Sequence, residues 1–379
     1  MLKITRYLSQ PIIDDLQTKM VFVGGPRQVG KTTLALSLFK ATKKDVPFYL
    51  NWDRLEDRSR LIKEQIPLDE KNLIFDEIHK YKFWRRLMKG LYDKHGDTHQ
   101  FIVTGSARLD HFRKGGDSLL GRYHYYRLHP LTLNEITNSP ARSDVDALLK
   151  FGGFPEPYFN GSEKHWRRWQ KERIARVVHE DLRDLQHVKE ISLIDILLDT
   201  LPSKVGSPLS IASLREDLGV AHQTVDGWVG ILDSLYMTYR ILPYGPPKVR
   251  AVKKEQKLYF WDWSMNTDPG ARFENMLASH LLKYCHYLED TEGYKMELRY
   301  LRDTDKREID FVVLKDKKPL FAAEAKLSDK ELSSHVKYFQ QRTNIPKFYQ
   351  VHLGEKDYGD ARTGRVLPFH KFCKEESLF

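Results

Sequence analysis

Residues 25–32 read Gly25-Pro26-Arg27-Gln28-Val29-Gly30-Lys31-Thr32, and Thr33 follows. The spacing is G-x-x-x-x-G-K-T. Residues 20–23 (MVFV) are short, apolar and β-branched, which predicts a buried strand, and residues 33–39 (TLALSLF) predict a helix. Because the glycines let backbone N–H groups curl at a helix N-terminus, this order predicts a phosphate-binding loop rather than a chance Gly-rich turn.

The side chains of this loop have distinct expected roles. Lys31 is expected to reach the β- and γ-phosphates of ATP, and the Thr32 hydroxyl is expected to bind Mg²⁺. The sequence therefore predicts ATP and Mg²⁺ as cofactors, with Lys31 also taking part in catalysis. The expected nucleotide-binding set is Gly25, Pro26, Arg27, Gln28, Val29, Gly30, Lys31, Thr32 and Thr33.

Two carboxylates follow a second apolar run, residues 72–75 (NLIF). Asp76 is placed to hold the Mg²⁺ shell, and Glu77 to orient or deprotonate the attacking water. Alone, two acids after a strand would indicate a solvated turn. Downstream of a phosphate loop they indicate catalysis, because a parallel βαβ architecture brings strand ends together. ATP hydrolysis is the expected reaction.

Two further residues are candidates for the same site. Residues 101–106 (FIVTGS) predict a strand beside the one that carries Asp76, so Ser106 or Thr104 could sense the γ-phosphate, and we favour Ser106. Arg122 precedes an aromatic strand at residues 123–126 and could be an arginine finger supplied to a neighbouring subunit. A solvated surface arginine is an equally good interpretation of Arg122.

Composition limits the class of protein. A chain of 379 residues can hold two to four domains, and 41% hydrophobic with 30% charged residues predicts globular folding. Only Cys285 and Cys373 are present, which argues against a disulfide framework or a thiolate metal site. We expect a cytoplasmic protein with no membrane span or signal peptide. The net charge of +10 favours a polyanionic partner, and nucleic acid is the expected one.

Residues 131–203 are expected to be helical, because apolar residues recur at three- and four-residue spacing between positions 182 and 198. Residues 166–169 (WRRW) and the bases that follow them mix aromatic and basic side chains. Such a mixture can form a nucleic-acid surface. We favour a helix whose Trp side chains pack inward while its Arg side chains lie in water.

Residues 204–262 have helix–turn–helix spacing: a short helix at 209–218, a turn at Gly219, and a longer helix at 221–235. A basic run that includes Lys257 then suits a wing against phosphates. The alternative is a winged helix used for protein packing, which Asp226 and Trp228 favour. The expected nucleic-acid contacts are His222, Gln223 and Thr224 in the helix, and Lys248, Arg250, Lys253 and Lys254 in the wing.

The last hundred residues hold a second set of acids. Asp310 lies in one expected strand, and strand alternation places Glu324 and Lys326 on one face of the next. Glu274, on an upstream helix, could approach the same point. Asp310 and Glu324 are expected metal ligands, and Glu274 and Lys326 further catalytic residues, with Lys326 steadying an attacking water or the developing phosphorane charge. The alternative is a structural ion pair made with Lys326.

The order of these parts resembles a large prokaryotic family of predicted AAA+ ATPases with a winged helix and a C-terminal PD-(D/E)xK, or restriction-endonuclease-like, domain. The resemblance is carried by the phosphate loop, residues 74–80 (IFDEIHK), 103–106 (VTGS), 120–122 (LGR) and 152–155 (GGFP), and the Asp…Glu-x-Lys hairpin. It implies an α/β fold with a RecA-like AAA+ parallel sheet, a helical lid, and a homo-oligomer such as a hexameric ring. Residues 261–265 (WDWSM) depart from the Asp-Thr-Gly-Leu usual among relatives.

The expected domains are an AAA+ core (1–130), a helical lid (131–203), a winged helix (204–262) and a nuclease-like domain (263–379). The expected function is that of an ATP-hydrolysing, DNA-binding protein that couples nucleotide state to a metal-dependent nuclease or DNA-remodelling activity on duplex or branched DNA. One alternative is a nucleotide-switched DNA-binding or regulatory ATPase whose nuclease-like domain is only a scaffold. Another is a signalling ATPase with a protein partner.

Overall fold

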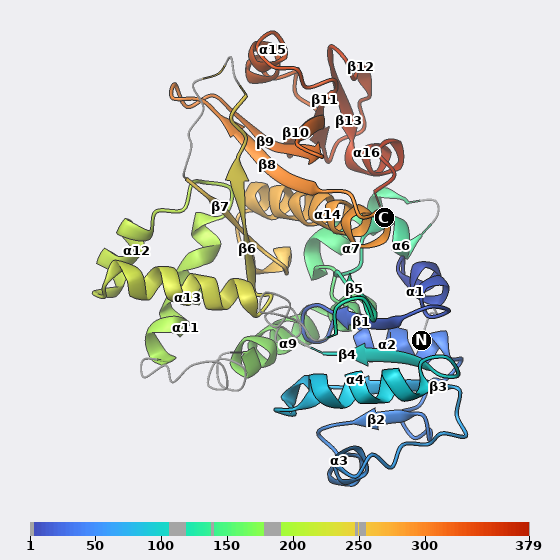
Figure 1. The fold of residues 1–379 in the computed structure, drawn as a ribbon. Helices are drawn as coiled ribbons and strands as arrows, with labels where there is room; N and C mark the ends of the chain where they lie inside the picture. Colours follow the sequence, from blue (N-terminus) through green and yellow to red (C-terminus); the bar gives the residue numbers. More distant parts are fainter. Residues whose placement is uncertain are drawn as a thin grey trace. The chain divides into compact units, whose positions relative to one another are not determined.

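The computed structural model describes residues 4–105, 119–137, 140–177, 191–246, 249 and 255–378. The chain forms two compact units, Met1–His129 and Pro130–Phe379. Each unit contains its own β-sheet, as Figure 1 shows. Within the described ranges, no helix is long and apolar enough to cross a lipid bilayer.

The first unit is built on a five-stranded parallel sheet in the order β2-β3-β4-β1-β5. Strand β4 pairs with β3 in register, with Asp76 opposite Thr104, which confirms the predicted neighbours. Parallel pairing brings the carboxyl ends of all five strands to one edge, where ligands bind in open α/β sheets. The strands are β1 (Met20–Gly24), β2 (Tyr49–Asn51), β3 (Asn72–Asp76), β4 (Gln100–Thr104) and β5 (Tyr123–Arg127).

Helices cover this sheet, and its strands are buried, as expected for parallel strands with apolar runs. Phe22, Phe75 and Phe101 belong to a core cluster that also takes in Trp84 and Leu91 of α4. The helices are α1 (Ser9–Asp15), α2 (Lys31–Leu38), α3 (Leu55–Ile62) and α4 (Trp84–His95), with a 3₁₀ turn η1 (Ile78–Lys80) after β3.

The second unit begins with helices, as predicted for the described part of residues 131–203. Trp169 is buried while Arg167 and Arg168 beside it are exposed, which confirms the inward packing of this aromatic side chain. The elements are α6 (Leu133–Ile136), α7 (Arg142–Phe151), α8 (Pro155–Asn160), α9 (Glu163–Arg176), α11 (Ile191–Thr200), η4 (Leu201–Lys204), α12 (Ile211–Leu218) and α13 (His222–Ser234).

Helices α12 and α13 follow the predicted helix–turn–helix spacing. Ser210 accepts a hydrogen bond from the Ser213 N–H and so caps α12, and Gly219 ends that helix at a φ of 67°. Trp228 is buried on α13, so its bulk lies in the core and not on the exposed face that would meet a partner.

An eight-stranded mixed sheet in the order β12-β13-β11-β10-β9-β8-β6-β7 forms the rest of the second unit. The predicted hairpin is present as antiparallel β9 and β10, and β10 also pairs parallel to β11. The elements are β6 (Thr238–Pro243), β7 (Lys257–Phe260), η5 (Trp263–Met265), α14 (Pro269–Glu292), β8 (Met296–Arg302), β9 (Glu308–Lys315), β10 (Lys318–Lys326), α15 (Ser334–Gln340), β11 (Phe348–His352), β12 (Tyr358–Asp360), β13 (Gly364–Pro368) and α16 (Phe369–Glu375).

Strand β6 links the two predicted C-terminal modules. It pairs antiparallel to β7 and parallel to β8, so the strands that follow α13 belong to the same sheet as the C-terminal acids. Residues predicted to form a wing therefore border the carboxylate cluster directly.

Candidate nucleotide site and carboxylate cluster

The loop between β1 and α2 turns sharply at its glycines. Gly30 precedes α2 at a φ of 101°, and Gly25 has a φ of 138°. A Cβ atom at Gly25 would lie 2.4 Å from the carbonyl oxygen of Leu128, so only glycine fits there. The loop lies at the carboxyl end of β1 and opens the N-terminus of α2, which is the position that favours phosphate binding.

Lys31 lies inside this loop. Its amine donates hydrogen bonds to the carbonyl oxygens of Gly25 at 2.9 Å and Pro26 at 2.7 Å, and the residue is buried. The positive charge therefore lies among the backbone atoms that would surround a phosphate group.

Asp76 is the centre of a hydroxyl network at the end of β3. Thr32 donates to its Oδ2 atom at 3.0 Å and Tyr49 donates to the same oxygen at 2.6 Å. Thr104 donates to the Oδ1 atom, and Asn51 donates to the Tyr49 hydroxyl at 3.0 Å. These bonds fix the orientation of the carboxylate. Sequence reasoning missed Tyr49, although the end of a neighbouring parallel strand is a place where such a residue could have been sought.

Glu77 follows Asp76 in a left-handed conformation, with a φ of 57°. Its N–H donates to the carbonyl oxygen of Thr104 at 2.9 Å, and its carboxylate lies 3.6 Å from His79 and from Lys80. Burial raises the pKa of Glu77, and the charge of Lys31 partly opposes that rise. Glu77 therefore shares one electrostatic environment with Lys31, as a general base at this site would.

The two remaining candidates of this unit differ in what the structure says of them. Ser106 lies outside the described residues, whereas Thr104, the other sensor candidate, hydrogen-bonds to Asp76. Arg122 lies at the amino end of β5, on the edge opposite the loop, and its guanidinium binds Asp93 at 2.6 Å. The finger role of Arg122 stays a prediction, and nothing in its contacts favours it over a surface ion pair.

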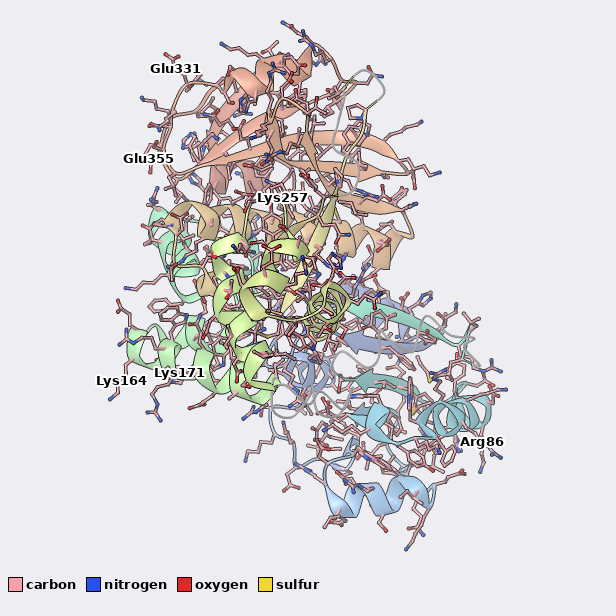
Figure 2. All side chains as sticks on the ribbon, turned by 90° about the vertical axis from the view of Figure 1, so that its left-hand side faces the viewer. Arg86, Lys164, Lys171, Lys257, Glu331 and Glu355 are labelled. Atoms are coloured by element: carbon pink, nitrogen blue, oxygen red, sulfur yellow. The ribbon has the colours of Figure 1, made fainter. Side chains whose placement is uncertain are left out.

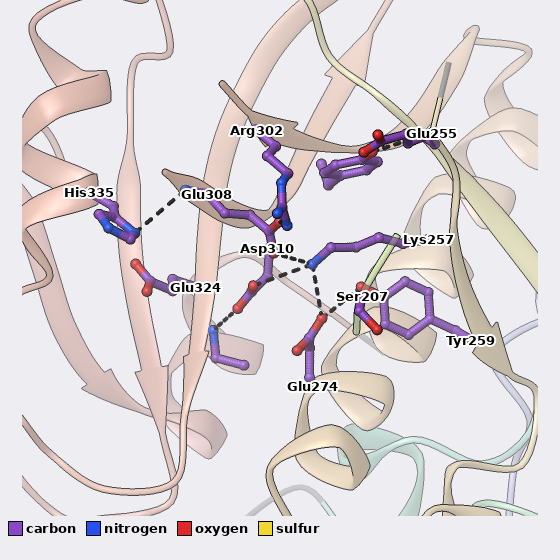
Figure 3. Close-up of polar contacts among 12 residues, drawn as sticks. Ser207, Glu255, Lys257, Tyr259, Glu274, Arg302, Glu308, Asp310, Glu324 and His335 are labelled. Atoms are coloured by element: carbon purple, nitrogen blue, oxygen red, sulfur yellow. Dashed lines mark hydrogen bonds and ion pairs between the residues drawn. The ribbon is translucent and has the colours of Figure 1, made fainter. Parts of the chain in front are cut away.

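A cluster of acids surrounds a buried lysine in the second unit, as Figure 3 shows. The Lys257 amine lies 2.5 Å from Glu308, 3.4 Å from Glu274 and 3.7 Å from Asp310. The side chain of Lys257 is fully buried. The prediction that Lys257 belongs to an exposed wing is therefore wrong, because its charge is taken up by three carboxylates inside the sheet.

Other groups complete the environment of Glu274 and Asp310. Tyr259 donates to Glu274 at 2.8 Å, and the Ala325 N–H donates to Asp310 at 2.8 Å. Gly206 has a φ of 78°, and a Cβ atom there would lie 2.7 Å from the Glu274 carboxylate. The structure thus brings Glu274 and Asp310 together, as expected, but through Lys257.

Glu324 and Lys326 form the other side of the cluster. The Lys326 amine lies 2.6 Å from the Oε1 atom of Glu324. The Oε2 atom of Glu324 is buried and accepts no hydrogen bond from any described residue. A buried carboxylate oxygen without a donor is costly, so this atom is a candidate ligand for a cation.

The acids of the cluster share a shifted titration. Burial and the nearby charge of Asp310 raise the pKa of Glu274 to about 7, although Lys257 opposes the rise. Burial also raises the pKa of Asp310 and of Glu324. These groups hold their negative charge less readily than ordinary carboxylates, so added positive charge would stabilise them.

The expected metal set is only partly supported. Among the described residues, no three His, Cys, Asp or Glu side chains are arranged so as to hold a metal ion. Glu274 is bound by Lys257 and Tyr259 instead, and Lys257 provides the cation that the crowded acids require. Metal binding by Asp310 and Glu324 stays a prediction, and the unbonded Glu324 oxygen is the observation that fits it.

The predicted nucleic-acid contacts fall into two groups. His222 and Gln223 are exposed and Thr224 half-buried at the start of α13. Asp226, on the same face, pairs with Arg240 at 3.4 Å. The wing residues Lys248, Arg250, Lys253 and Lys254 lie outside the described residues.

The sequence departure at residues 261–265 forms a buried polar junction. Asp262 accepts hydrogen bonds from the backbone and side chain of Ser264. Trp166 and Gln170 donate to the Ser264 hydroxyl at 3.0 Å each, which ties α9 to this segment. The segment therefore serves packing within the second unit.

Relatives and solved structures were compared with the chain. It is 21% identical to an uncharacterized protein of Methanocaldococcus jannaschii (MJ1544), over 91% of this chain and 83% of that protein. It is 24% identical to an uncharacterized protein of Mycobacterium tuberculosis (Rv2008c), over 64% of this chain and 54% of that protein. The chain thus spans about half the length of the mycobacterial relative.

Two solved structures show distant similarity. One is the Thermotoga maritima RuvB Holliday junction branch migration motor, with 17% identity, coverage of 62% of this chain and 90% of that chain, and a TM-score of 0.32. The other is the Aeropyrum pernix ORC1 protein in complex with DNA, with 14% identity, coverage of 73% and 93%, and a TM-score of 0.33. Scores this low place no function on the chain.

Family models match three successive parts of the chain. Residues 142–267 match a domain of unknown function (DUF8612), and residues 269–372 match another (DUF4143). Residues 17–137 match the AAA domain and span the five-stranded sheet together with the loop, Asp76 and Glu77. The match agrees with the geometry of the site, and it supports an AAA+ ATPase fold for the first unit.

Proposed function

We propose that the first unit binds ATP with Mg²⁺ and hydrolyses it. The observation that carries this proposal is the hydrogen bond from Thr32 to Asp76, which joins the loop to the end of β3. A hydroxyl and a carboxylate side by side are the oxygen ligands that Mg²⁺ prefers. Bound there, Mg²⁺ would neutralise charge on the β- and γ-phosphates.

The side chains around this pair have roles that follow from their positions. Lys31 exchanges its bonds to Gly25 and Pro26 for phosphate oxygens. Glu77 accepts a proton from the attacking water, and its raised pKa suits a general base better than that of an exposed glutamate. Thr104 and Tyr49 hold Asp76 in one orientation.

Phosphate release from ATP tests this proposal. Lys31→Ala is expected to abolish turnover, because it removes the charge that stabilises the transferring phosphoryl group. Lys43→Ala, at an exposed position, is the matched control and is expected to turn over ATP like the wild type. Equal turnover in all three proteins would contradict the proposal.

We further propose that DNA is the partner of this ATPase. The net charge of +10 and the exposed start of α13, with His222 and Gln223, support a polyanionic partner. ATP turnover is then expected to rise with duplex or branched DNA, and DNA retention is expected to fall steeply with salt. Turnover indifferent to DNA, with no retention at modest salt, would favour a protein partner instead.

A second function, metal-dependent cleavage of phosphodiester bonds, is favoured by the cluster in the second unit. Asp310 and Glu324 lie on the paired strands β9 and β10, Lys326 contacts Glu324, and one Glu324 oxygen accepts no hydrogen bond from the described residues. The element order α14-β8-β9-β10-α15-β11 is consistent with the restriction-endonuclease-like fold expected from the resemblance. In this role Lys326, which is 40% exposed, would steady the attacking water or the phosphorane charge.

End-labelled linear and branched DNA, incubated with ATP and either Mg²⁺ or Mn²⁺, tests the second function. The wild type is expected to cleave DNA and Lys326→Ala to leave it intact, while Lys318→Ala, an exposed lysine of the same strand, serves as the control. Intact DNA in every lane, with shifted complexes, would make the cluster a scaffold for binding. A homo-oligomer and a cytoplasmic location remain part of the proposal.

A further inference from the structure

Lys257 differs from the other basic residues near it because its charge is hidden from solvent. It opens β7, where it pairs with Ile241 of β6, and a bridge to Pro208 holds its backbone from the other side. Figure 2 shows Lys257 inside the second unit, while Lys164 and Lys171 project from α9. A lysine buried in this way requires compensating charge, since an isolated buried ammonium is strongly disfavoured.

The compensation comes from one side of the cluster only. Glu274 and Glu308 both contact the Lys257 amine, and Arg302 binds the other oxygen of Glu308 at 2.8 Å. On the opposite side, Glu324 contacts Lys326. Asp310 lies between the two sides, with one oxygen 3.7 Å from Lys257 and the other accepting from the Ala325 N–H.

The arrangement divides the acids into a filled part and an open part. Four carboxylates, those of Glu274, Glu308, Asp310 and Glu324, face three cations, Lys257, Arg302 and Lys326, which leaves one net negative charge when all are ionised. The Glu324 oxygen without a donor lies on the open side. One more cation completes the balance there, while the Lys257 amine fills the Glu274 side.

We propose that Lys257 stands in for a second divalent cation, so that the cluster takes a single divalent cation held by Asp310 and Glu324. This inference rests on the proposed phosphodiesterase site. Two-metal sites clamp the attacking and leaving oxygens between two ions about 3.5–4 Å apart. Here the second positive charge is part of the chain, carried by a strand whose neighbour β6 follows α13 directly.

Counting bound Mn²⁺ tests the inference without measuring cleavage. The full chain carries Asp76→Asn, which removes the metal ligand of the nucleotide site, and Mn²⁺ is titrated in the absence of nucleotide, with free Mn²⁺ read by electron paramagnetic resonance. One ion is expected per chain. Adding Lys257→Met is expected to raise the count to two, whereas Lys257→Arg keeps the charge and is expected to leave the count at one.

The control variant is Lys318→Met, whose exposed lysine lies outside the cluster, and it is expected to bind one ion. Thermal unfolding with and without Mn²⁺ gives a second readout, because a ligand that binds only the folded chain raises its melting temperature. Lys257→Met is expected to gain more from Mn²⁺ than Lys257→Arg does, including the case in which Lys257→Met folds only with the metal present.

The outcomes separate the inference from the function on which it rests. One ion in both the Lys257→Met and the parent chains, with equal thermal gains, would overturn the role of Lys257 and leave the single-cation site standing. Two ions in every chain would also overturn it. No ion in any chain would contradict the proposed phosphodiesterase site itself, and the inference with it.

Discussion

Thr32 and Asp76, 44 residues apart in the chain, are joined by a 3.0 Å hydrogen bond from hydroxyl to carboxylate. The bond links the start of α2 to the end of β3, two elements that are not neighbours in the sequence. Because Tyr49 and Thr104 bind the same carboxylate, four segments of the first unit converge on Asp76. The predictions for this unit concern what happens when that convergence is disturbed.

Tyr49→Phe removes one donor from Asp76 and leaves the aromatic ring in place. A hydrogen bond to a charged group contributes about 1.5–3 kcal/mol, part of which the remaining donors recover. We expect the Mg²⁺ concentration for half-maximal ATP turnover to rise by roughly tenfold, with little change in melting temperature. A titration of turnover with Mg²⁺ checks this, and an unchanged midpoint would mean that Tyr49 does not position Asp76.

Glu77 is expected to set the acidic limb of the pH profile for ATP turnover. A general base works only when deprotonated, and burial raises the pKa of Glu77. Turnover should therefore fall, as the pH is lowered, at a higher pH than an ordinary glutamate would give. Glu77→Gln is expected to lower turnover by roughly 10²- to 10⁴-fold and to leave nucleotide binding intact. A residual limb of unchanged position in the variant would assign the titration to another group.

Glu274 is expected to make stability depend on pH. Its pKa is about 7 in the folded protein, above the model value of 4.5, so the folded state holds a proton that the unfolded state has lost. This contribution is fully present below pH 4.5 and is lost as the pH rises to about 7. Glu274→Gln should flatten the fall in melting temperature across that window, and an unchanged pH dependence would contradict the assignment.

Lys283 and Glu135 form a buried ion pair in the second unit, in which the lysine also donates to Thr132 at 2.6 Å. Lys283→Ala leaves a buried carboxylate without its lysine and is expected to cost about 3–5 kcal/mol of unfolding free energy. The double variant Lys283→Met with Glu135→Leu should recover most of that loss. Urea unfolding measures both, and a neutral Lys283→Ala would show that the carboxylate is solvated in solution.

Much of the first unit could be predicted from local sequence, for a physical reason. A parallel strand buried on both faces needs an apolar run, and residues 20–23, 72–75 and 101–103 each provide one. The loop is equally local, because its glycines are required by backbone conformation. The three-residue strand β2, which carries Tyr49, is too short to give such a pattern.

The second unit shows where local reasoning ends. Alternation correctly placed Asp310, Glu324 and Lys326 on paired strands, since the period of a strand is two residues. It could not show that Lys257 turns inward, because a basic run before a strand has the same composition whether its last lysine faces water or acids. That choice depends on β6 pairing with β8, a contact between segments far apart in the chain.

The most direct test of the central claim is single-turnover ATP hydrolysis in Mg²⁺ by the wild type and by Asp76→Asn, with Asp93→Asn as the control. Asp76 meets Thr32 at the loop, whereas Asp93 binds Arg122 at the opposite edge of the sheet. We expect wild type and Asp93→Asn to hydrolyse bound ATP at similar rates, and Asp76→Asn to be slower by roughly 100-fold or more. Equal rates in all three would contradict the assignment of this site as the ATPase centre.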